Sequence, residues 1–374
     1  MKARLGDYIQ EYSVRNKAGE DIPVYSVTNT QGFCRDYFGK EVASQNKSTY
    51  KIVPKGCFAY NPSRINVGSI DWQRHSDQVI VSPLYNVFSV SSELDQQYLY
   101  YYLKSNFTLQ RIKAVATGSV RDNLKLDMLF DFPIELPPIQ KQKEIANILD
   151  KIKKVMVLKR RELSTLDDFI KARFVEMFGD QRINPLCFEK KKIRDTCIVV
   201  TGNTPSRTIP EYYGDYLEWI KTDNIVLGRL NPTKAAEFLS EEGVNIGRTV
   251  DKGSILMACI AGSVASIGKV CIADRRVAFN QQINAVIPQK YDVLFLYVML
   301  QISKDYLVEE INMALKGILS KSKLEEKEFI VPPMELQERF SAFVGQVNRA
   351  KVAVQEALGE TQILFDSLMQ QYFS

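Results

Sequence analysis

The 374-residue sequence contains only one histidine, His75, and its six cysteines never approach a Cys-x-x-Cys spacing. A zinc ribbon or a dithiol redox centre needs closely spaced cysteines, and a histidine metal site needs more than one imidazole. His75 has no recognisable nucleophile or orienting group near it in the sequence, so we interpret it as a surface or loop residue and not as a general base. The sequence therefore predicts neither a metal nor a cofactor, and we expect the cysteines to be buried thiols.

Two further absences concern membranes and charge. The sequence has no run of 18 or more apolar residues and no signal-peptide pattern, which favours a cytoplasmic protein without a membrane partner. The 49 basic and 44 acidic side chains give a formal net charge of +5. That excess is compatible with a local basic face but is too small to indicate nucleic-acid binding.

Motifs for catalysis are incomplete. Five residues stand between Gly262 and Gly268 where a phosphate-binding loop has four, and Val270 occupies the position of the magnesium-binding hydroxyl. Asn61-Pro62 is followed by Ser63 and Arg64, which departs from the Asn-Pro-Pro-aromatic signature of adenine methyltransferases. We find no coherent active site, which favours a recognition module that works with a catalytic partner.

What the sequence does contain is an internal repeat. Residues 134–178 align with residues 329–373 without a gap, so that the second copy follows about 195 residues after the first. Pro137-Pro138 then matches Pro332-Pro333, Gln142 matches Gln337, and Phe178 matches Phe373. The order along the chain is head, helix, head, helix. This order is typical of a protein that recognises its ligand with two domains.

Each repeated segment predicts a long helix. Proline suits the first turn of a helix, and the first copy then has neither proline nor glycine until Gly179. Apolar residues recur at helical spacing and define one stripe per helix. The stripes are Ile145, Ile148, Ile152, Val155, Leu163, Leu166, Ile170, Phe174 and Met177, and then Phe340, Phe343, Val347, Ala350, Val354, Ala357, Leu364 and Leu368.

The two stripes favour an antiparallel, coiled-coil-like pair within one chain. A helix of about 39 residues rises about 58 Å, which is longer than a small domain is wide. Its own head cannot cover such a stripe, whereas the matching stripe of the other helix can. Dimerisation through the helix, or docking of the helix on a globular domain, are the alternatives.

The predicted fold class is mixed α/β (α+β), with two globular heads, two long antiparallel helices as a coiled-coil spacer, and a pseudo-two-fold internal repeat. The heads are related but diverged: Pro54-Lys55-Gly56 matches Asp251-Lys252-Gly253, and Gly68 matches Gly268. Short runs rich in Val, Ile, Tyr and Phe alternate with Gly, Pro and Asn, and helices are expected around residues 95–114 and 292–315. The expected divisions are 1–136 for the first head, 137–180 for the first helix, 181–331 for the second head and 332–374 for the second helix.

Polar and basic loops are the distinctive surface of each head. They include Asn61 to Arg64 and Thr117 to Arg121 in the first head, and Thr201 to Arg207 in the second. Hydroxyl, amide and basic groups on loops are the groups that contact phosphates and base edges of DNA. Ordinary solvated turns have the same composition, so both interpretations stay open for any single loop.

On these residues the chain resembles the specificity (S) subunit of type I restriction-modification systems. The resemblance covers essentially the whole chain, and its most specific elements are the strand-Pro-Pro-helix junctions, Glu135 to Gln142 and Ile330 to Gln337. The Thr201-Gly202-Asn203-Thr204-Pro205 loop and the Gly118-Ser119-Val120-Arg121 loop are also similar to family patterns. The first head departs from the family in lacking a Gly-x-Thr-Pro loop, and the second has Gly317-Ile318-Leu319-Ser320 in place of Gly-Ser-x-Arg.

The resemblance implies a non-catalytic subunit in the cytoplasm of a prokaryote. Its partners would be duplex DNA, two copies of the adenine methyltransferase (M) subunit and, in the full complex, restriction (R) subunits. Each head, as a target-recognition domain, would read one half of an asymmetric bipartite site, and the helices would set the gap between the halves. Half-sites about one DNA turn apart, 34–36 Å, suit two heads held by a rigid spacer.

Candidate site residues follow from the loops and from the resemblance. The DNA-contact candidates are Arg64, Lys113, Ser119, Arg121 and Lys125 in the first head, and Thr204, Ser206, Arg207, Lys221, Asn224, Lys316 and Lys323 in the second. The region around Gln142 and Gln337, with the outward faces of the helices, is the expected docking site for the methyltransferase.

Two other functions fit parts of the sequence. A coiled-coil scaffold or adaptor whose heads bind proteins would share the architecture but would not bind random duplex DNA in a salt-sensitive manner. A self-sufficient methyltransferase or nuclease would need a cofactor loop or a metal-binding carboxylate cluster, and the sequence offers neither.

Overall fold

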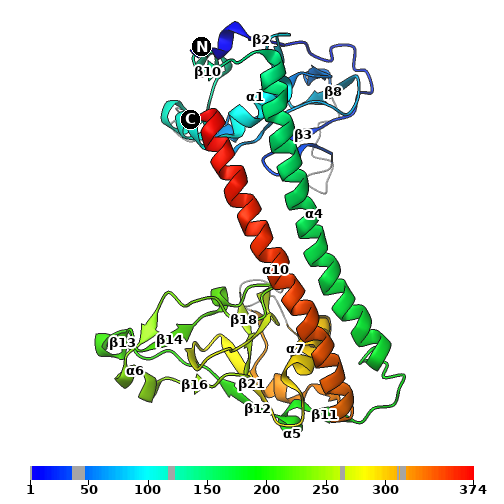
Figure 1. Ribbon diagram of the computed structural model, residues 1–374, viewed down its shortest axis with the longest axis vertical. Helices are drawn as coiled ribbons and strands as arrows, with labels where there is room; N and C mark the ends of the chain where they lie inside the picture. The colour runs from blue at the N-terminus through cyan, green and yellow to red at the C-terminus, as the bar shows by residue number, and fades with distance from the viewer. Residues whose placement is uncertain (1, 36–46, 117–122, 262–265, 310, 312–316) are drawn as a thin grey trace. The chain divides into compact units, whose positions relative to one another are not determined.

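The computed structural model describes residues 2–35, 47–116, 123–261, 266–309, 311 and 317–374. The chain divides into two compact units, unit 1 with Met1–Leu158 and Ala357–Ser374, and unit 2 with Lys159–Glu356 (Figure 1). Each unit contains one head and a part of both long helices. Both helices are therefore integral to the packing of the heads.

The elements of unit 1 are short strands followed by helices. They are β1 Lys2–Arg4, η1 Leu5–Asp7, β2 Ile9–Glu11, β3 Ser26–Thr28, β4 Gly32–Cys34, β5 Lys51–Pro54, β6 Phe58–Tyr60, η2 Ile65–Val67, β7 Ile70–Trp72, β8 Gln78–Val81, β9 Asn86–Val90, α1 Gln96–Lys104, α2 Asn106–Val115, α3 Leu126–Phe130, β10 Pro133–Glu135 and the start of α4 Ile139–Phe178.

Unit 2 follows the same plan with additional strands. Its elements are β11 Lys190–Lys192, α5 Ile193–Thr196, β12 Cys197–Thr201, η3 Pro210–Tyr212, β13 Tyr213–Gly214, β14 Leu217–Ile220, η4 Thr222–Asn224, β15 Phe238–Leu239, α6 Glu241–Ile246, β16 Thr249–Val250, β17 Ile255–Ala258, β18 Ile260–Ala261, β19 Val270–Ile272, β20 Val277–Phe279, β21 Ile283–Pro288, α7 Val293–Ile302, α8 Lys304–Val308, β22 Gly317–Ile318, α9 Lys321–Glu326, β23 Glu328–Ile330 and the start of α10 Met334–Phe373.

The two heads share one scaffold. The four-stranded sheet has the order β2-β9-β6-β7 in unit 1 and β12-β21-β17-β19 in unit 2, and all its neighbours are antiparallel. In each head the first and last strands pair with each other, β1 with β10 and β11 with β23. These matching orders confirm the mixed α/β fold and the relation between the heads that the sequence predicts.

The heads diverge in their second sheets. Unit 1 has two separate two-stranded sheets, β3-β4 and β5-β8. Unit 2 has a five-stranded sheet of order β13-β15-β14-β20-β16, in which β14 and β20 are parallel. The common sheet is thus combined with different additions, and these additions carry most of the loops in which the two heads differ.

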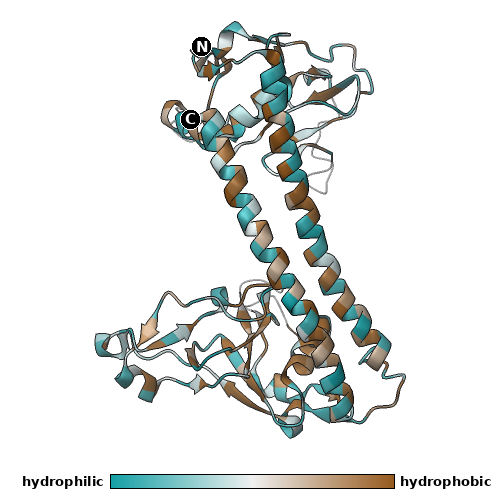
Figure 2. Cartoon of the chain, viewed as in Figure 1, coloured by the Kyte–Doolittle hydropathy of each residue, from teal (hydrophilic) through white to brown (hydrophobic). Residues whose placement is uncertain are grey.

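The long helices α4 and α10 each contain 40 residues and begin directly after a Pro-Pro pair. Gly345 and Gly359 do not interrupt α10, and no side-chain or distant backbone atom lies within 4 Å of the Cβ position of Gly359. Polar and apolar residues alternate around both helices (Figure 2). In the part of the chain that the structure describes, no helix is both long enough and apolar enough to cross a membrane.

The apolar stripes of the two helices meet in an antiparallel order, as the sequence predicts, and residues of the heads pack against them as well. In unit 2, Phe174 and Phe340 are fully buried together with Phe295 of α7, and their ring centroids lie 5.5–6.2 Å apart. In unit 1, Ile145 of α4 and Phe373 of α10 share a core with Tyr98 of α1. The end of one helix thus meets the start of the other in both units, which is an antiparallel arrangement, and the head supplies the third wall.

Several positions of the predicted stripes are exposed. Ile148, Val155, Ala350 and Leu364 face solvent to a large extent, although the helical period includes them in the stripes. The prediction that the two stripes pack together therefore does not extend to these positions. Helix-period reasoning finds the apolar faces but cannot tell which turns the head domains cover.

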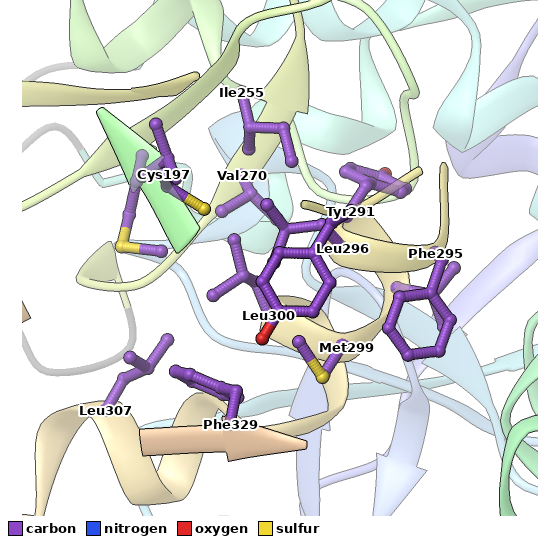
Figure 3. Close-up of a cluster of buried hydrophobic side chains, with 14 of the residues drawn as sticks. Cys197, Ile255, Val270, Tyr291, Phe295, Leu296, Met299, Leu300, Leu307 and Phe329 are labelled. Atoms are coloured by element: carbon purple, nitrogen blue, oxygen red, sulfur yellow. The ribbon is translucent and has the colours of Figure 1, made fainter. Parts of the chain in front are cut away.

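The core of unit 2 lies between the common sheet, α7 and α10. Figure 3 shows Ile255 and Val270 of the sheet with Phe295, Leu296 and Met299 of α7 in this core. Buried apolar side chains of this size each contribute about 1.5–3 kcal/mol by leaving water. Helix α7 consists mostly of apolar residues, which suits a helix that is covered on most sides.

Four of the six thiols follow the expectation that they are buried. Cys57, Cys197, Cys259 and Cys271 are buried, and desolvation raises the pKa of Cys259 to about 12. Cys34 is half-buried, whereas Cys187 is exposed and adopts a left-handed backbone with φ 56°. The prediction of a buried thiol is wrong for Cys187, because this residue lies in the turn-rich connection between α4 and β11.

A buried glutamine joins each long helix to its head. Gln142 accepts a hydrogen bond from the backbone N–H of Asp95 at 2.9 Å and donates to the carbonyl oxygens of Glu93 and Pro137. Gln337 accepts from the N–H of Asp292 at 2.9 Å and donates to the carbonyl oxygen of Pro332 at 2.8 Å. The two junctions are the same structure formed twice.

We predict that Gln337→Ala destabilises unit 2 by about 2–4 kcal/mol, because it leaves a buried N–H and a buried carbonyl without partners. The chain has two tryptophans, Trp72 in unit 1 and Trp219 in unit 2. Urea unfolding in a Trp72→Phe background, followed by the fluorescence of Trp219, measures this unit alone. Gln346→Ala, at an exposed position of the same helix, is the matched control. Equal midpoints for the two variants would contradict the prediction.

Candidate nucleic-acid interface

Three of the basic candidates in the first head lie on neighbouring elements. Arg64 directly precedes η2, and α2, which carries Lys113, packs against η2. The N–H of Leu124, next to Lys125, donates a hydrogen bond of 3.2 Å to the carbonyl oxygen of Pro62. The structure therefore brings together cations that are up to about 60 residues apart in the sequence.

These three cations are available for a ligand. Arg64, Lys113 and Lys125 are exposed, and within the described residues none of them forms an ion pair. Ser119 and Arg121 lie outside the described residues, in the segment between α2 and Asn123. A set of unpaired cations on one face is the arrangement that attracts phosphate groups.

In the second head, the loop after β12 is held by its own backbone contacts. A Cβ atom on Gly202 would lie 2.2 Å from the carbonyl oxygen of Asn280, so this close approach admits only glycine. Asn203 donates to the carbonyl oxygen of Ile246 at 2.9 Å and accepts from the N–H of Arg248 at 2.8 Å. The loop therefore presents Thr204 and Ser206, which are exposed, from a fixed position.

Arg207 and Lys221 meet at a single carboxylate. Arg207 pairs with Glu237 at 2.5 Å, and Lys221 pairs with the other oxygen of the same group. The hydrogen bond from Lys221 and, after it, that from Arg207 hold the pKa of Glu237 below its usual range. Two cations and one carboxylate leave a local excess of positive charge.

The two cations of this cluster also contact two aromatic rings. The guanidinium of Arg207 lies 4.4 Å from the ring centroid of Tyr213 and 5.2 Å from that of Trp219. The ammonium of Lys221 lies 5.0 Å from the Trp219 ring. Cation–π contact restricts both side chains. Arg207 is exposed and Lys221 is half-buried. The cluster consists of Arg207, Tyr213, Trp219, Lys221 and Glu237.

Three of the polar candidates serve the fold. Asn224 is buried and uses its amide to bond Lys221 N–H, the Thr233 hydroxyl and the carbonyl oxygen of Lys234. Gln142 and Gln337 are buried in the junctions described above, so neither amide faces a partner. The sequence could not distinguish them from surface residues, because an amide suits a buried backbone contact as well as a ligand.

The remaining candidates of the second head are placed as follows. Lys323 is exposed on α9, which packs against α5 and β12. Lys316 lies outside the described residues. The described residues contain no group of three or more His, Cys, Asp or Glu side chains that could hold a metal ion.

A second cationic cluster was not found by sequence reasoning. In unit 1, Arg74, Lys104 and Lys153 surround the ring of Tyr100 at 5.2–5.7 Å, and Arg74 also pairs with Asp71. Burial lowers the pKa of Lys104 to about 8. Its members come from the loop after β7, from α1 and from α4, so no local motif in the sequence could have indicated the cluster.

Comparison with known proteins agrees with the division of the chain into two repeated halves. The family model of the type I restriction modification DNA specificity domain matches the chain twice, at residues 6–167 and 185–360. The two matches together cover most of the chain, and each spans one head with a part of the adjoining helix. The chain belongs to the type I restriction-modification DNA specificity family.

Curated members of the specificity family align with parts of the chain. The HindI specificity subunit of Haemophilus influenzae is 31% identical over 31% of this chain and 25% of its own length. The MjaIX specificity subunit of Methanocaldococcus jannaschii is 28% identical over 46% of this chain and 41% of its own length. The aligned segments thus span less than half of these relatives.

Solved structures show the same fold over the full chain. A chain from a study of complex assembly and conformational transition in the type I R-M system superposes with a TM-score of 0.60 at 18% identity, covering 100% of this chain and 97% of that one. The type I restriction-modification S subunit from M. genitalium gives 0.57 at 13% identity, with 100% and 96% coverage. At these identities the specificity-family fold is shared, while the side chains of the loops are not.

We predict that Arg64→Ala and Lys125→Ala each weaken binding to random duplex DNA and reduce the slope of log K against log salt by about 1. The physical reason is that each unpaired cation would release one condensed counterion from DNA. Fluorescence anisotropy over a series of KCl concentrations measures the slope. Lys151→Ala, which removes an exposed lysine from α4, controls for net charge. A slope unchanged from that control would remove both residues from the interface.

Proposed function

We propose that this chain is the DNA-reading specificity subunit of a type I restriction-modification complex. Each head reads one half of an asymmetric bipartite site in duplex DNA, and the chain itself catalyses no reaction. The observation that carries the proposal is the repetition of one scaffold, with sheet order β2-β9-β6-β7 and β12-β21-β17-β19, beneath different second sheets. Two heads that share a scaffold but differ in their loops suit a protein that recognises two half-sites of different sequence.

The DNA-contact surfaces differ between the heads in the manner that this proposal requires. The first head offers the unpaired cations Arg64, Lys113 and Lys125. The second offers Arg207 and Lys221 on an aromatic support, next to the fixed hydroxyl of Thr204. Phosphate contacts of the first kind give affinity and position, whereas oriented Arg and hydroxyl groups read base edges. Ser119, Arg121, Lys316 and Lys323 remain proposed contacts on the basis of the sequence alone.

The helices act as the spacer in this proposal, with the antiparallel order seen in each unit. Within unit 2 the ammonium of Lys351 on α10 lies 2.5 Å from the carboxylate of Asp167 on α4. Lys351 is almost fully buried, so this pair fixes the register of the two helices at that point. A change of spacer length must therefore be made in both helices at once.

We predict that seven residues inserted into each helix lengthen the gap in the DNA site by about three base pairs, since two helical turns rise about 10.5 Å and each base pair about 3.4 Å. Placing the insertions eight positions before Asp167 and eight positions after Lys351 preserves their pairing. Sequencing of adenine methylation in DNA exposed to the chain and its methyltransferase subunit measures the motif.

The half-sites should stay the same in that experiment, and an insertion into α4 alone is the control, because it breaks the register. A continuous motif without a gap, or a gap that does not respond to the paired insertion, would overturn the two-reader proposal. Lack of any salt-sensitive binding to duplex DNA would instead favour a protein-binding scaffold.

The methyltransferase is proposed to dock on apolar residues of the helices that the heads leave exposed. Val157 of α4 and Val352 of α10 are equivalent positions of the repeat, and they are 59% and 52% exposed. Phe169 and Leu364 form a second equivalent pair, at 53% and 51%. Unit 1 holds Val157 and Leu364, and unit 2 holds Val352 and Phe169, so each unit has one member of each pair. Two such surfaces suit two methyltransferase subunits, with restriction subunits joining the assembled complex.

We predict that Val157→Glu or Val352→Glu reduces the complex from two methyltransferase subunits to one, and that the double variant binds none. A charge placed in an apolar docking surface is buried without a partner when the complex forms. Native mass spectrometry of the co-expressed subunits counts the copies. Gln355→Glu introduces the same charge at an exposed polar position of α10 and should assemble normally. Full assembly of the double variant would place the docking surface elsewhere.

A further inference from the structure

Unit 2 contains a cavity of about 460 Å³ between α4, α7, α10 and the loop that follows η4. Asp167 and Lys171 of α4 form one wall, and Asn348 and Lys351 of α10 form the next. Tyr297 of α7 lines the inner end. A cavity of this volume is in the range of small-molecule sites.

The polar lining of this cavity is rich in donors. Lys171, Lys269, Lys304 and Lys351 line it, together with a single carboxylate, Asp167. That carboxylate is already held by Lys351 at 2.5 Å. The side-chain nitrogen of Asn348 is buried and has no hydrogen-bond partner in the described part of the chain. A buried donor without an acceptor, next to several ammonium groups, is suited to an anion.

The rest of the lining is apolar. Ile170, Leu230, Val298 and Val344 contribute to it, and Leu227 reaches it from the loop after η4. An inorganic anion would leave this surface without a partner, whereas an organic molecule that carries the anion would cover it. The described lining holds lysines and no arginine. Arginine matches planar carboxylates best, whereas lysine binds phosphate as a point charge. The lining therefore favours a phosphate over a carboxylate.

The internal repeat provides a comparison within the same chain. In unit 1 the ammonium of Lys153 lies 5.2 Å from the ring centroid of Tyr100, and Asp150 accepts hydrogen bonds from Tyr101 and Gln97. The equivalent positions in unit 2 are Asn348 for Lys153 and Gly345 for Asp150, while Tyr297 is the equivalent of Tyr100. The long Lys153 of one copy is thus replaced by the shorter Asn348 in the other, and Asn348 lines the cavity.

From these observations we propose that the cavity binds a small phosphorylated organic molecule of nucleotide size. The phosphate contacts Lys269 and the amide of Asn348, and the organic part lies against Leu230 and Val298. Lys269 is half-buried and forms no ion pair within the described residues, so its charge is available to the ligand. This site is separate from the proposed DNA contacts of the second head, Arg207 and Lys221, which line no part of the cavity.

Isothermal titration calorimetry of the full chain at constant ionic strength tests the proposal with three probes: AMP, inorganic phosphate and adenosine. AMP should bind with one site per chain, and both fragments should bind at least about tenfold more weakly, because each lacks one half of the contacts. Asn348→Asp has the same shape but replaces the donor by a carboxylate. It should weaken AMP binding by more than about tenfold, and Lys269→Ala by about tenfold.

Lys151→Ala, at an exposed position in unit 1, should bind AMP as the unchanged chain does. Circular dichroism and the fluorescence of Trp219 verify that each variant is folded. The proposal is wrong if AMP gives no saturable heat up to about 10 mM, or if Asn348→Asp binds AMP normally. It is also wrong if only duplex DNA responds to these variants, since the cavity would then receive a phosphate of the DNA backbone.

Discussion

The buried glutamine at the start of each long helix is the contact on which the architecture depends. It satisfies the N–H of Asp95 or Asp292, and the carboxylate of the same aspartate caps the head helix that follows, α1 or α7. One hydrogen-bonded group therefore sets where the head helix begins and how the long helix leaves the head. Because buried amides are rarely left without hydrogen bonds, this junction admits few alternative geometries. A head joined to its spacer without freedom at this point can hold its loops in a defined orientation.

The long helices and the relation between the heads could be predicted from the sequence, because both rest on local signals. A Pro-Pro pair followed by uninterrupted helix formers, and a gap-free repeat, need no knowledge of distant contacts. The burial of the stripes could not be predicted in the same way. Phe174 and Phe340 are buried because Phe295 of α7 closes over them, while Ile148 and Val155 have the same period and remain exposed. The period shows which face is apolar, and tertiary packing decides which turns are covered.

The candidate site was predictable to a similar degree. Loop position and charge selected Arg64 and Lys125 as DNA contacts, and the structure shows that both cations are exposed. The same reasoning also selected Asn224 and Gln142, whose amides are used inside the fold. Amides are chosen by proteins for ligands and for buried backbone groups alike, so residue type does not separate the two uses. The rings that contact Arg207 and Lys221 come from β13 and β14, whereas Arg207 lies in the loop before β13 and Lys221 directly follows β14. Only the folded chain shows that the two cations share Glu237.

The internal repeat explains why a chain of this kind can change the ligands of its heads and keep the scaffold that the heads share. The common sheet, the paired end strands and the glutamine junction recur in both units, so substitutions there would disturb packing that each head needs. The loops and second sheets carry no such constraint, and they are where the heads differ. The same contrast between a constant scaffold and divergent side chains is found in the interior next to the long helices. Lys153 of unit 1 is matched by the shorter Asn348, which lines the cavity of unit 2. The side chain at this position differs between the copies while the common sheet and the glutamine junction stay the same, so the opening in unit 2 follows from divergence of the repeat and not from the demands of the fold.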